Sequence, residues 1–319
     1  MDEITAFKHA TSQRSKALAK LIKTFEVRRG LTGTPNANGI LDLWHQVYLL
    51  DDGERLGPRY WPFRSTVCEP VQVGRSAHAI RWDEKPGARD VVGGLIADIT
   101  VRNVFEECLD IPPNKKTTVH FELSPKHRKL YDQFQRDALL ELEAGDVTAT
   151  HAGILANKLL QIASGAVYDE DHVAQVLASE RYELVMDLVE ERTACLVAFN
   201  WRHQREQLEA LAKARKLPYA VIDGTVSDAD RQKAVRQFQA GALRLILAQP
   251  QSASHGLTLT RGTATIWASP VYDAERYEQF CRRIYRATQT RATETIHVAA
   301  RNTIDEQVFE KLTEKMGRM

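Results

Sequence analysis

Short uninterrupted runs of apolar residues alternate with amphipathic stretches throughout the second half of the chain. The apolar runs predict buried strands at residues 194–199, 219–222, 243–248, 265–268 and 295–299. The amphipathic stretches predict helices at residues 201–216, 228–240 and 273–286, followed by a last helix from Ile304. Because strands and helices alternate at this spacing, we expect an α/β domain built on a parallel sheet with helices on both faces.

The middle of the chain has helical patterns. Residues 124–144 begin with Ser-Pro, which suits the N-cap and first turn of a helix, and residues 149–163 predict a second helix. The preceding Ile111-Pro112-Pro113 favours an extended chain, because a residue before proline avoids helical geometry. We therefore expect residues 111–165 to form a helical linker or insert between two larger bodies, residues 1–110 and 166–319.

The N-terminal body is less regular than the C-terminal one. Helical patterns cover residues 12–25 and 41–50. Residues 53–90 are rich in glycine, proline and charged side chains, and they predict loops and short helices.

Composition narrows the class of protein without identifying a ligand. The chain has 319 residues, of which 43% are hydrophobic and 27% charged, and its net charge is +1. Any nucleic-acid surface must therefore be a local patch. The four cysteines form no Cys-x-x-Cys pair, which argues against a zinc site or a disulfide framework. No apolar run approaches the roughly 20 residues of a membrane span, so we expect a cytoplasmic protein with no membrane partner.

Three polar stretches are candidates for a site. The hydroxyl-rich turn 31-LTGTPNANG-39 follows a basic helix, and the alternative is a turn that only joins two elements. The loop 249-QPQSASHGLTLT-260 follows a predicted strand, where parallel sheets place ligand groups, although it also fits a surface loop. The third stretch, 223-DGTVSDADRQKAVRQF-238, fits a helix capped by Ser227 or Asp228 and predicts scaffolding rather than a site.

A fourth stretch, 277-YEQFCRRIYRATQTR-291, is dense in arginine. Gln279, Arg283 and Arg286 are spaced i, i+4 and i+7, which predicts that they share one helix face. Acidic residues occur only upstream, so we expect the arginines from 282 to 291 to lack an acidic partner. Unpaired guanidinium groups favour a phosphate-bearing ligand, which their planar fork binds bidentately. A solvated helix face is the alternative.

Taken together, these stretches resemble the Swi/Snf-type branch of the superfamily-two helicase-like ATPases, especially the compact versions of bacterial viruses. LTGTP with Asn38 resembles helicase motif three, 194-ACLVAF-199 motif four, 254-SHGLTL-259 motif five and residues 279–289 motif six. The chain departs from the family pattern at three positions, where Thr258 replaces asparagine, Arg282 glycine and Tyr285 histidine. The resemblance also includes Arg102 in 99-ITVRN-103, residues 109–113 and 123-LSPKHRKLYDQF-134, so it spans essentially the whole chain.

The resemblance implies two RecA-like domains with ATP and Mg²⁺ in the cleft between them and DNA across both. In that frame Arg283 and Arg286 resemble arginine fingers, which stabilise charge during phosphoryl transfer. The residues implied to couple the nucleotide state to the rest of the protein are Thr32, Gly33, Thr34, Gln279 and Gly256. The residues implied to contact DNA are Asn38, Arg102, Ser252, Ser254, Thr258 and Arg282.

The start of the chain resembles the family's DExx motif. Asp2 is similar to the aspartate that holds Mg²⁺, and Glu3 to the glutamate that orients water. The strand expected before Asp2 is absent, so we expect these carboxylates to be disordered. None of the seventeen glycines is followed by lysine, so the sequence has no Walker A P-loop.

We therefore expect a complete C-terminal RecA-like domain and a truncated N-terminal RecA-like half-domain that begins at the DExx motif. The main hypothesis is the C-terminal portion of a DNA-dependent ATPase or double-stranded DNA translocase, completed by a separate N-terminal P-loop polypeptide. If the protein is viral, it acts in the host cytoplasm. The alternative is a non-catalytic DNA- or protein-binding regulator or inhibitor that retains the helicase fold.

Overall fold

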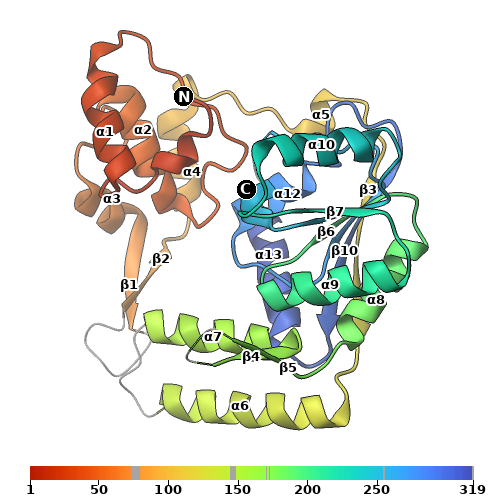
Figure 1. The fold of residues 1–319 in the computed structure, drawn as a ribbon. Helices are drawn as coiled ribbons and strands as arrows, with labels where there is room; N and C mark the ends of the chain where they lie inside the picture. Colours follow the sequence, from red (N-terminus) through yellow and green to blue (C-terminus); the bar gives the residue numbers. More distant parts are fainter. Residues whose placement is uncertain (73–79, 144–148, 170, 172, 254–255, 318–319) are drawn as a thin grey trace. The chain divides into compact units, whose positions relative to one another are not determined.

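The computed structural model describes residues 1–319 except 73–79, 144–148, 170, 172, 254–255 and 318–319 (Figure 1). The chain divides into two compact units, which are Met1–Val104 with Glu314–Met319 and Phe105–Thr313. We call them unit one and unit two. No helix among the described residues is both long enough and apolar enough to span a bilayer.

Unit two is built on a six-stranded sheet with the strand order β3-β10-β9-β6-β8-β7, and every pair of neighbouring strands is parallel. The strands are β3 (Asn114–Phe121), β6 (Cys195–Ala198), β7 (Tyr219–Ile222), β8 (Leu245–Ala248), β9 (Ala264–Trp267) and β10 (Thr293–Ala300). Strands β6, β8 and β9 are buried along their whole length, as their uninterrupted apolar runs require. The predicted parallel sheet is confirmed.

Helices cover both faces of this sheet, with α8 and α9 on one side and α10 on the other (Figure 1). The helices around the sheet are α8 (Glu180–Glu190), α9 (Arg202–Ala214), α10 (Asp228–Gln239), α11 (Pro250–Ala253), α12 (Ala274–Cys281) and α13 (Ile304–Gly317). Helices α8 and α9 pack Tyr182, Met186 and Leu208 against the strands in the main apolar core. The N-cap of α10 is Ser227, whose side chain accepts a hydrogen bond from Asp230 N.

Residues 111–165 belong to unit two, which differs from the helical linker that we expected. The helices α6 (Pro125–Glu143) and α7 (Ala149–Ala163) lie where they were predicted, and the hairpin of β4 (Ala166–Tyr168) and β5 (Ala174–Val176) follows them. The strand β3, however, pairs in parallel with β10 as the edge of the main sheet. Its sequence lacks an apolar run because it is an edge strand, and its Lys115 and Lys116 are exposed.

Unit one is mainly helical. Its elements are the 3₁₀ turns Ile4–Phe7, Ile22–Thr24, Ile40–Asp42 and Ala97–Ile99, the helices α1 (Gln13–Leu21), α2 (Leu43–Asp51), α3 (Tyr60–Val67) and α4 (Ala88–Ile96), and the strands β1 (Cys68–Gln72) and β2 (Ile80–Glu84). Its core gathers Ile40, Trp44, Phe63 and Val92. The prediction of loops and short helices at residues 53–90 was incomplete, because β1 and β2 pair there as an antiparallel hairpin.

Candidate functional site

The arginine-rich stretch begins as a helix and ends as a series of turns. Helix α12 is capped by Asp273, whose carboxylate accepts from Arg276 N at 3.0 Å, and it ends at Cys281. Residues 282–288, which we call the finger turn, continue as turns. The prediction of a helix to residue 286 was therefore wrong beyond Cys281, and so was the single helix face for Gln279, Arg283 and Arg286.

Two of the three arginines of the finger turn, Arg283 and Arg286, nevertheless converge on one acceptor. Arg283 Nη1 and Arg286 Nη1 donate to the carbonyl oxygen of Leu257, at 3.4 and 3.0 Å. Arg286 Nη1 also donates to Thr258 Oγ1 at 3.3 Å, and Arg283 Nε donates to the carbonyl oxygen of Gln279 at 2.8 Å. The motif-six residues are thus brought together through main-chain oxygen atoms and not through a helix face.

The acceptors of Arg286 carry no net charge. Within the described part of the chain, no carboxylate lies within ion-pair distance of its guanidinium. A guanidinium held by a carbonyl and a hydroxyl keeps an uncompensated positive charge, and charged acceptors form stronger hydrogen bonds than neutral ones. Arg286 is therefore poised to exchange these acceptors for an anion such as a phosphate.

Gln289 fastens the finger turn to residues 256–263, which we call the motif-five loop. Its side chain is buried, and Nε2 donates to the carbonyl oxygens of Thr260, Gly262 and Ile284 at 3.0 to 3.2 Å. Leu259 N also donates to Arg283 O at 2.8 Å. From the sequence, Gln289 has no role beyond membership of motif six, because its burial leaves no trace there.

Two glycines explain the path of the motif-five loop. Gly256 has a φ of +72°, a conformation that side-chain-bearing residues rarely adopt. A Cβ atom at Gly262 would lie 2.5 Å from Ile284 Cδ1, so the loop and the finger turn approach too closely for a larger residue. Ser252 lies just upstream in α11, a short helix where a loop was predicted, and Ser254 lies outside the described residues.

Helix α12 rests on a buried aromatic layer. Trp267 stacks on Tyr277 with ring centroids 5.0 Å apart, and Tyr277 OH lies 2.9 Å from His297 Nε2. Burial lowers the pKa of His297 to about 4, so the imidazole is neutral at physiological pH. The layer places the start of the finger turn at a fixed position on the sheet.

The other arginines of the stretch are engaged within unit two. Arg282 Nε lies 2.7 Å from Glu278 Oε1, and Nη2 lies 3.3 Å from Glu106 Oε1. The expectation that this arginine lacks an acidic partner was therefore wrong. Arg291 donates to the carbonyl oxygen of Arg261. In contrast to Arg286, Arg282 already has its charge compensated.

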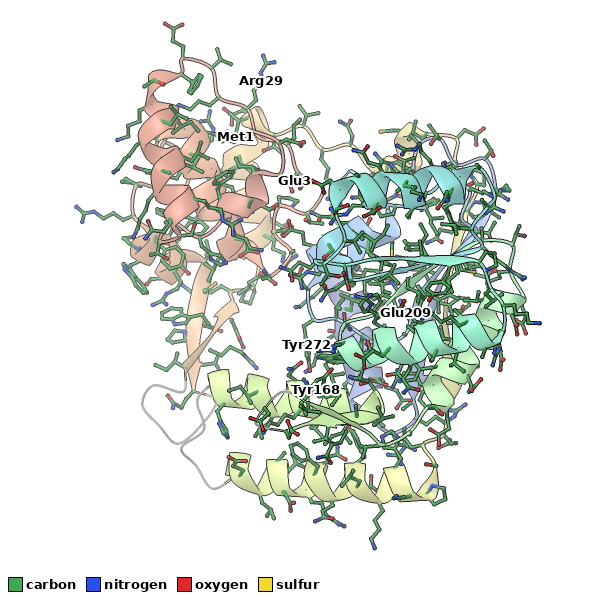
Figure 2. All side chains as sticks on the ribbon, in the orientation of Figure 1. Met1, Glu3, Arg29, Tyr168, Glu209 and Tyr272 are labelled. Atoms are coloured by element: carbon green, nitrogen blue, oxygen red, sulfur yellow. The ribbon has the colours of Figure 1, made fainter. Side chains whose placement is uncertain are left out.

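In unit one, the DExx-like residues are tied to the LTGTP turn. Leu31 N donates to Met1 O at 2.9 Å, and Ile4 N donates to Leu31 O at 3.0 Å. The N-terminal ammonium group donates to Arg29 O at 2.6 Å, and Figure 2 labels Met1, Glu3 and Arg29 in this segment. The expectation that these carboxylates are disordered was wrong, because this pairing orders the residues on both sides of them.

The carboxylates of this segment suit a magnesium ion that substrate phosphates also bind, rather than an ion that is bound by protein side chains alone. Asp2 is exposed, and its Oδ1 accepts only from Glu3 N, at 3.1 Å, among the contacts of the described residues. The described residues hold no cluster of three or more His, Cys, Asp or Glu that suits a metal ion. Mg²⁺ commonly binds through one or two carboxylates together with substrate phosphates and water, so Asp2 fits such an ion.

The LTGTP turn is held by its own hydroxyl groups and by α2. Thr34 is buried, and its N donates to Thr32 Oγ1 at 3.1 Å, while Gly33 is exposed. Gln46 Nε2 reaches Pro35 O at 2.6 Å. Asn38 donates from N and Nδ2 to Asp42 Oδ2, both at 3.1 Å. Arg102, the remaining predicted site residue of unit one, is exposed.

Comparisons with known proteins match both units. Residues 1–166 match the model of the SNF2-related domain, and residues 180–288 match that of the helicase conserved C-terminal domain. The chain is 31% identical to protein p41 of Acyrthosiphon pisum secondary endosymbiont phage 1, over 95% of this chain and 66% of that protein. It is 24% identical to the DNA annealing helicase and endonuclease ZRANB3 of Homo sapiens, over 99% of this chain and 28% of that protein.

A solved structure confirms the fold. The SWI2/SNF2 ATPase core of Sulfolobus solfataricus in complex with double-stranded DNA superposes with a TM-score of 0.50 at 19% identity, covering 99% of this chain and 66% of that one. The chain thus spans about two thirds of the phage relative and less than a third of the human one. Its RecA-like α/β fold and its two domain matches agree, and the chain belongs to the Swi/Snf-type, SNF2-related family of superfamily-two helicase-like ATPases.

Proposed function

We propose that this chain is the finger-bearing portion of a DNA-dependent ATPase that translocates along double-stranded DNA. The observation that carries the proposal is the pair of arginines on Leu257 O, of which Arg286 is held by neutral acceptors alone. An arginine held in this way, as Arg286 is, is available to a phosphate. Their place beside the motif-five loop links that phosphate to the proposed DNA track.

The roles of the residues follow from their contacts. Arg283 and Arg286 bind the γ-phosphoryl oxygens in exchange for Leu257 O, and they stabilise the charge that develops in phosphoryl transfer. Asp2 holds the magnesium ion, which when bound supplies neutralising charge at the phosphates, and Glu3 orients the attacking water. The carboxylate pair is coupled to the rest of unit one through Thr32, Gly33 and Thr34. The link is the preceding Leu31, whose N donates to Met1 O and whose O accepts from Ile4 N.

The coupling to DNA runs through the motif-five loop. Thr258 accepts from Arg286, so a phosphate that draws Arg286 away frees the hydroxyl of Thr258. Gly256 allows the loop to move at a position with positive φ, and Gln279 holds Arg283 through its carbonyl oxygen. We propose DNA backbone contacts for Thr258 of the motif-five loop, for Ser252 and Ser254 just upstream of it, and for Asn38 and Arg102 of unit one. For Arg282, which is already paired, we propose a different role below.

Hydrolysis requires a P-loop that these residues do not contain, because none of the seventeen glycines is followed by lysine. We propose that a P-loop-bearing segment completes the site. Unit one offers this segment a set of exposed apolar side chains close in sequence to the LTGTP turn. These are Leu21, Phe25, Val27 and Leu31, at 57%, 54%, 71% and 66% exposure. Contiguous exposed apolar surface marks an interaction site, and we propose that these side chains form such a surface.

The test is complementation. A P-loop polypeptide, sought first in the reading frame immediately upstream, is co-purified with the chain, and ATP hydrolysis is measured with and without double-stranded DNA. We expect DNA-stimulated hydrolysis from the mixture and none from either part alone. Leu31→Glu serves as the association control, because a charge at an exposed apolar position blocks packing without disturbing the core.

The second candidate is a non-catalytic DNA- or protein-binding regulator that retains the helicase fold. The missing P-loop favours it. Its signature is DNA binding that Arg283→Ala and Arg286→Ala leave unchanged, together with no hydrolysis in the presence of any P-loop polypeptide. If the chain is instead part of a DNA-dependent ATPase, both substitutions abolish hydrolysis in the mixture of chain and P-loop polypeptide, which we call the complemented mixture. The chain still binds its partner in both variants.

A further inference from the structure

Two of the three positions at which the chain departs from the family pattern contact the same short helix. Helix α5 (Phe105–Cys108) opens unit two, directly after Val104. Arg282 Cζ lies 4.2 Å from the centroid of the Phe105 ring, and the Phe105 ring packs edge-on to Tyr285 with centroids 5.6 Å apart. Arg282 Cζ also lies 5.2 Å from the Tyr285 centroid. The guanidinium is therefore flanked by two aromatic rings.

Glu106 completes the cluster through its ion pair with Arg282 Nη2 at 3.3 Å. We call Phe105, Glu106, Arg282 and Tyr285 the α5 clamp. A guanidinium is attracted to the face of an aromatic ring, and the attraction is stronger where water is excluded. Tyr285 is only 9% exposed, so the clamp can hold the conformation of a short turn.

The α5 clamp and the motif-five loop hold different residues of the finger turn. Leu257 and Gln289 contact Arg283, Arg286 and Ile284, whereas Phe105 and Glu106 contact Arg282 and Tyr285. The family glycine at position 282 has no side chain that reaches α5. The departures from the family pattern therefore create the second attachment of an otherwise irregular segment.

We propose that Phe105 and Glu106 are positioning residues for the arginine fingers. They hold Arg282 and Tyr285, and thereby keep the finger turn in the geometry in which Arg283 and Arg286 share one acceptor. All four residues of the clamp belong to unit two, so it holds the finger turn within that unit. The structural part of this inference stands alone, and its catalytic consequence rests on the proposed function.

Hydrogen exchange of the purified chain, followed by mass spectrometry, tests the structural part. In Phe105→Ala we expect the amides of the finger turn to exchange about tenfold faster, because local opening no longer breaks the aromatic contacts. We expect a smaller rise of a few-fold in Glu106→Gln. Phe105→Tyr restores the slow exchange of the wild type, and Glu107→Gln, one residue along the same helix, leaves it unchanged.

A merely stabilising role predicts a different pattern, in which exchange rises across the whole of unit two and the melting temperature falls. If Phe105→Ala unfolds the unit in this way, Glu106→Gln decides, because its side chain lies at the surface. The inference is overturned if the finger turn in Glu106→Gln, or in folded Phe105→Ala, exchanges at the same rate as in Glu107→Gln.

Steady-state kinetics of ATP hydrolysis in the complemented mixture test the catalytic consequence. A positioning role predicts a lower kcat in Phe105→Ala with little change in the KM for ATP, and recovery in Phe105→Tyr. Equal kcat in Phe105→Ala and the wild type contradicts that role. Failure of the proposed function has a different signature, since the wild-type mixture then hydrolyses no ATP while the exchange experiment still reports on the clamp.

Discussion

Arg286 and Leu257 are joined by a hydrogen bond of 3.0 Å from the guanidinium Nη1 to the main-chain carbonyl oxygen, although 29 positions separate them in the sequence. Arg283 reaches the same oxygen at 3.4 Å. A carbonyl oxygen holds a guanidinium without neutralising it, so an arriving phosphate replaces a weaker acceptor with a stronger one. On the proposed function, a phosphate that binds Arg286 therefore affects both the finger turn and the motif-five loop.

Substitution of Arg286 tests the role of this charge. In the complemented mixture, Arg286→Ala should lower the rate of ATP hydrolysis by about a thousandfold or more, the size of effect associated with arginine fingers. Arg286→Lys should recover little of this loss, because an ammonium group lacks the planar fork. Steady-state hydrolysis at saturating DNA measures both.

The matched control for Arg286 is Arg236→Ala on α10, where the side chain is exposed. We expect its rate to remain within about twofold of the wild type, as for an ordinary surface substitution. An equal loss of activity in both variants contradicts a specific role for Arg286.

The close approach of the motif-five loop to the finger turn predicts that Gly262→Ala is destabilising. Its Cβ would lie 2.5 Å from Ile284 Cδ1 and 3.0 Å from Leu259 O. We expect unfolding to become easier by about 1–3 kcal/mol, the usual range for overpacking. Chemical denaturation measures the change.

Gly153→Ala on α7 provides the comparison, because nothing lies within 4 Å of the added Cβ. Alanine favours a helix interior over glycine by about 1 kcal/mol. The two Gly→Ala substitutions should therefore shift stability in opposite directions, and a neutral Gly262→Ala contradicts the close approach of loop and turn.

Breaking the buried ion pair of Arg181 and Asp305 should destabilise unit two strongly. Arg181 and Asp305 are 2% and 0% exposed, and Arg181 also donates to the carbonyl oxygens of Ala163, Ala268 and Val298. Arg181→Met leaves the Asp305 carboxylate buried without its cation, so we expect a loss of about 3–5 kcal/mol. Arg202→Ala, which removes an exposed pair with Glu206, should change stability by less than about 1 kcal/mol. Similar losses from both substitutions contradict this account.

The stability of unit two should fall as the pH is lowered from about 6.5 towards 4. Burial lowers the pKa of both His203 and His297 from 6.5 to about 4. The unfolded chain therefore binds more protons than the folded one within this window, so stability is lost as pH falls through it and regained as pH rises. At about pH 5 we expect an effect on the order of 2 kcal/mol per histidine.

Thermal unfolding at about pH 7 and about pH 5 measures this dependence. His203 is hydrogen bonded to Ser164 and Tyr168 at both ring nitrogens, each at 2.9 Å, so its neutral form is the one built into the fold. His297→Gln should flatten the pH dependence without removing it, since His203 remains. If the stability of His297→Gln falls as steeply with pH as that of the wild type, the assignment to His297 is contradicted.

The sequence was sufficient to predict the elements whose burial produces a recognisable pattern of apolar residues. The central strands β6, β8 and β9 are buried on both faces, and their apolar runs predicted them to within about two residues. The edge strand β3 was missed because it has one partner strand, and its charged side chains mask the alternation. The hairpin of β1 and β2 was missed for a related reason, since Cys68 is the one fully buried residue of its two strands.

The sequence proposes residues for the candidate site but does not predict their contacts. The motifs identified Arg283, Arg286 and Gln279, yet the acceptor that the two arginines share is a main-chain oxygen, which leaves no trace in the sequence. The partner of Arg282 at Glu106 lies 176 positions away and cannot be inferred from helical spacing. Its other partner, Glu278, lies at i−4, so helical spacing could have predicted this ion pair.

The most direct test of the central claim is steady-state ATP hydrolysis by the purified 319-residue chain, with and without double-stranded DNA, beside its Arg286→Ala variant. Since the finger arginines are present and a Walker A lysine is not, we predict that the two proteins are indistinguishable from background, with or without DNA. DNA-stimulated hydrolysis by the chain alone, lost in Arg286→Ala, would contradict the claim that the P-loop must come from elsewhere.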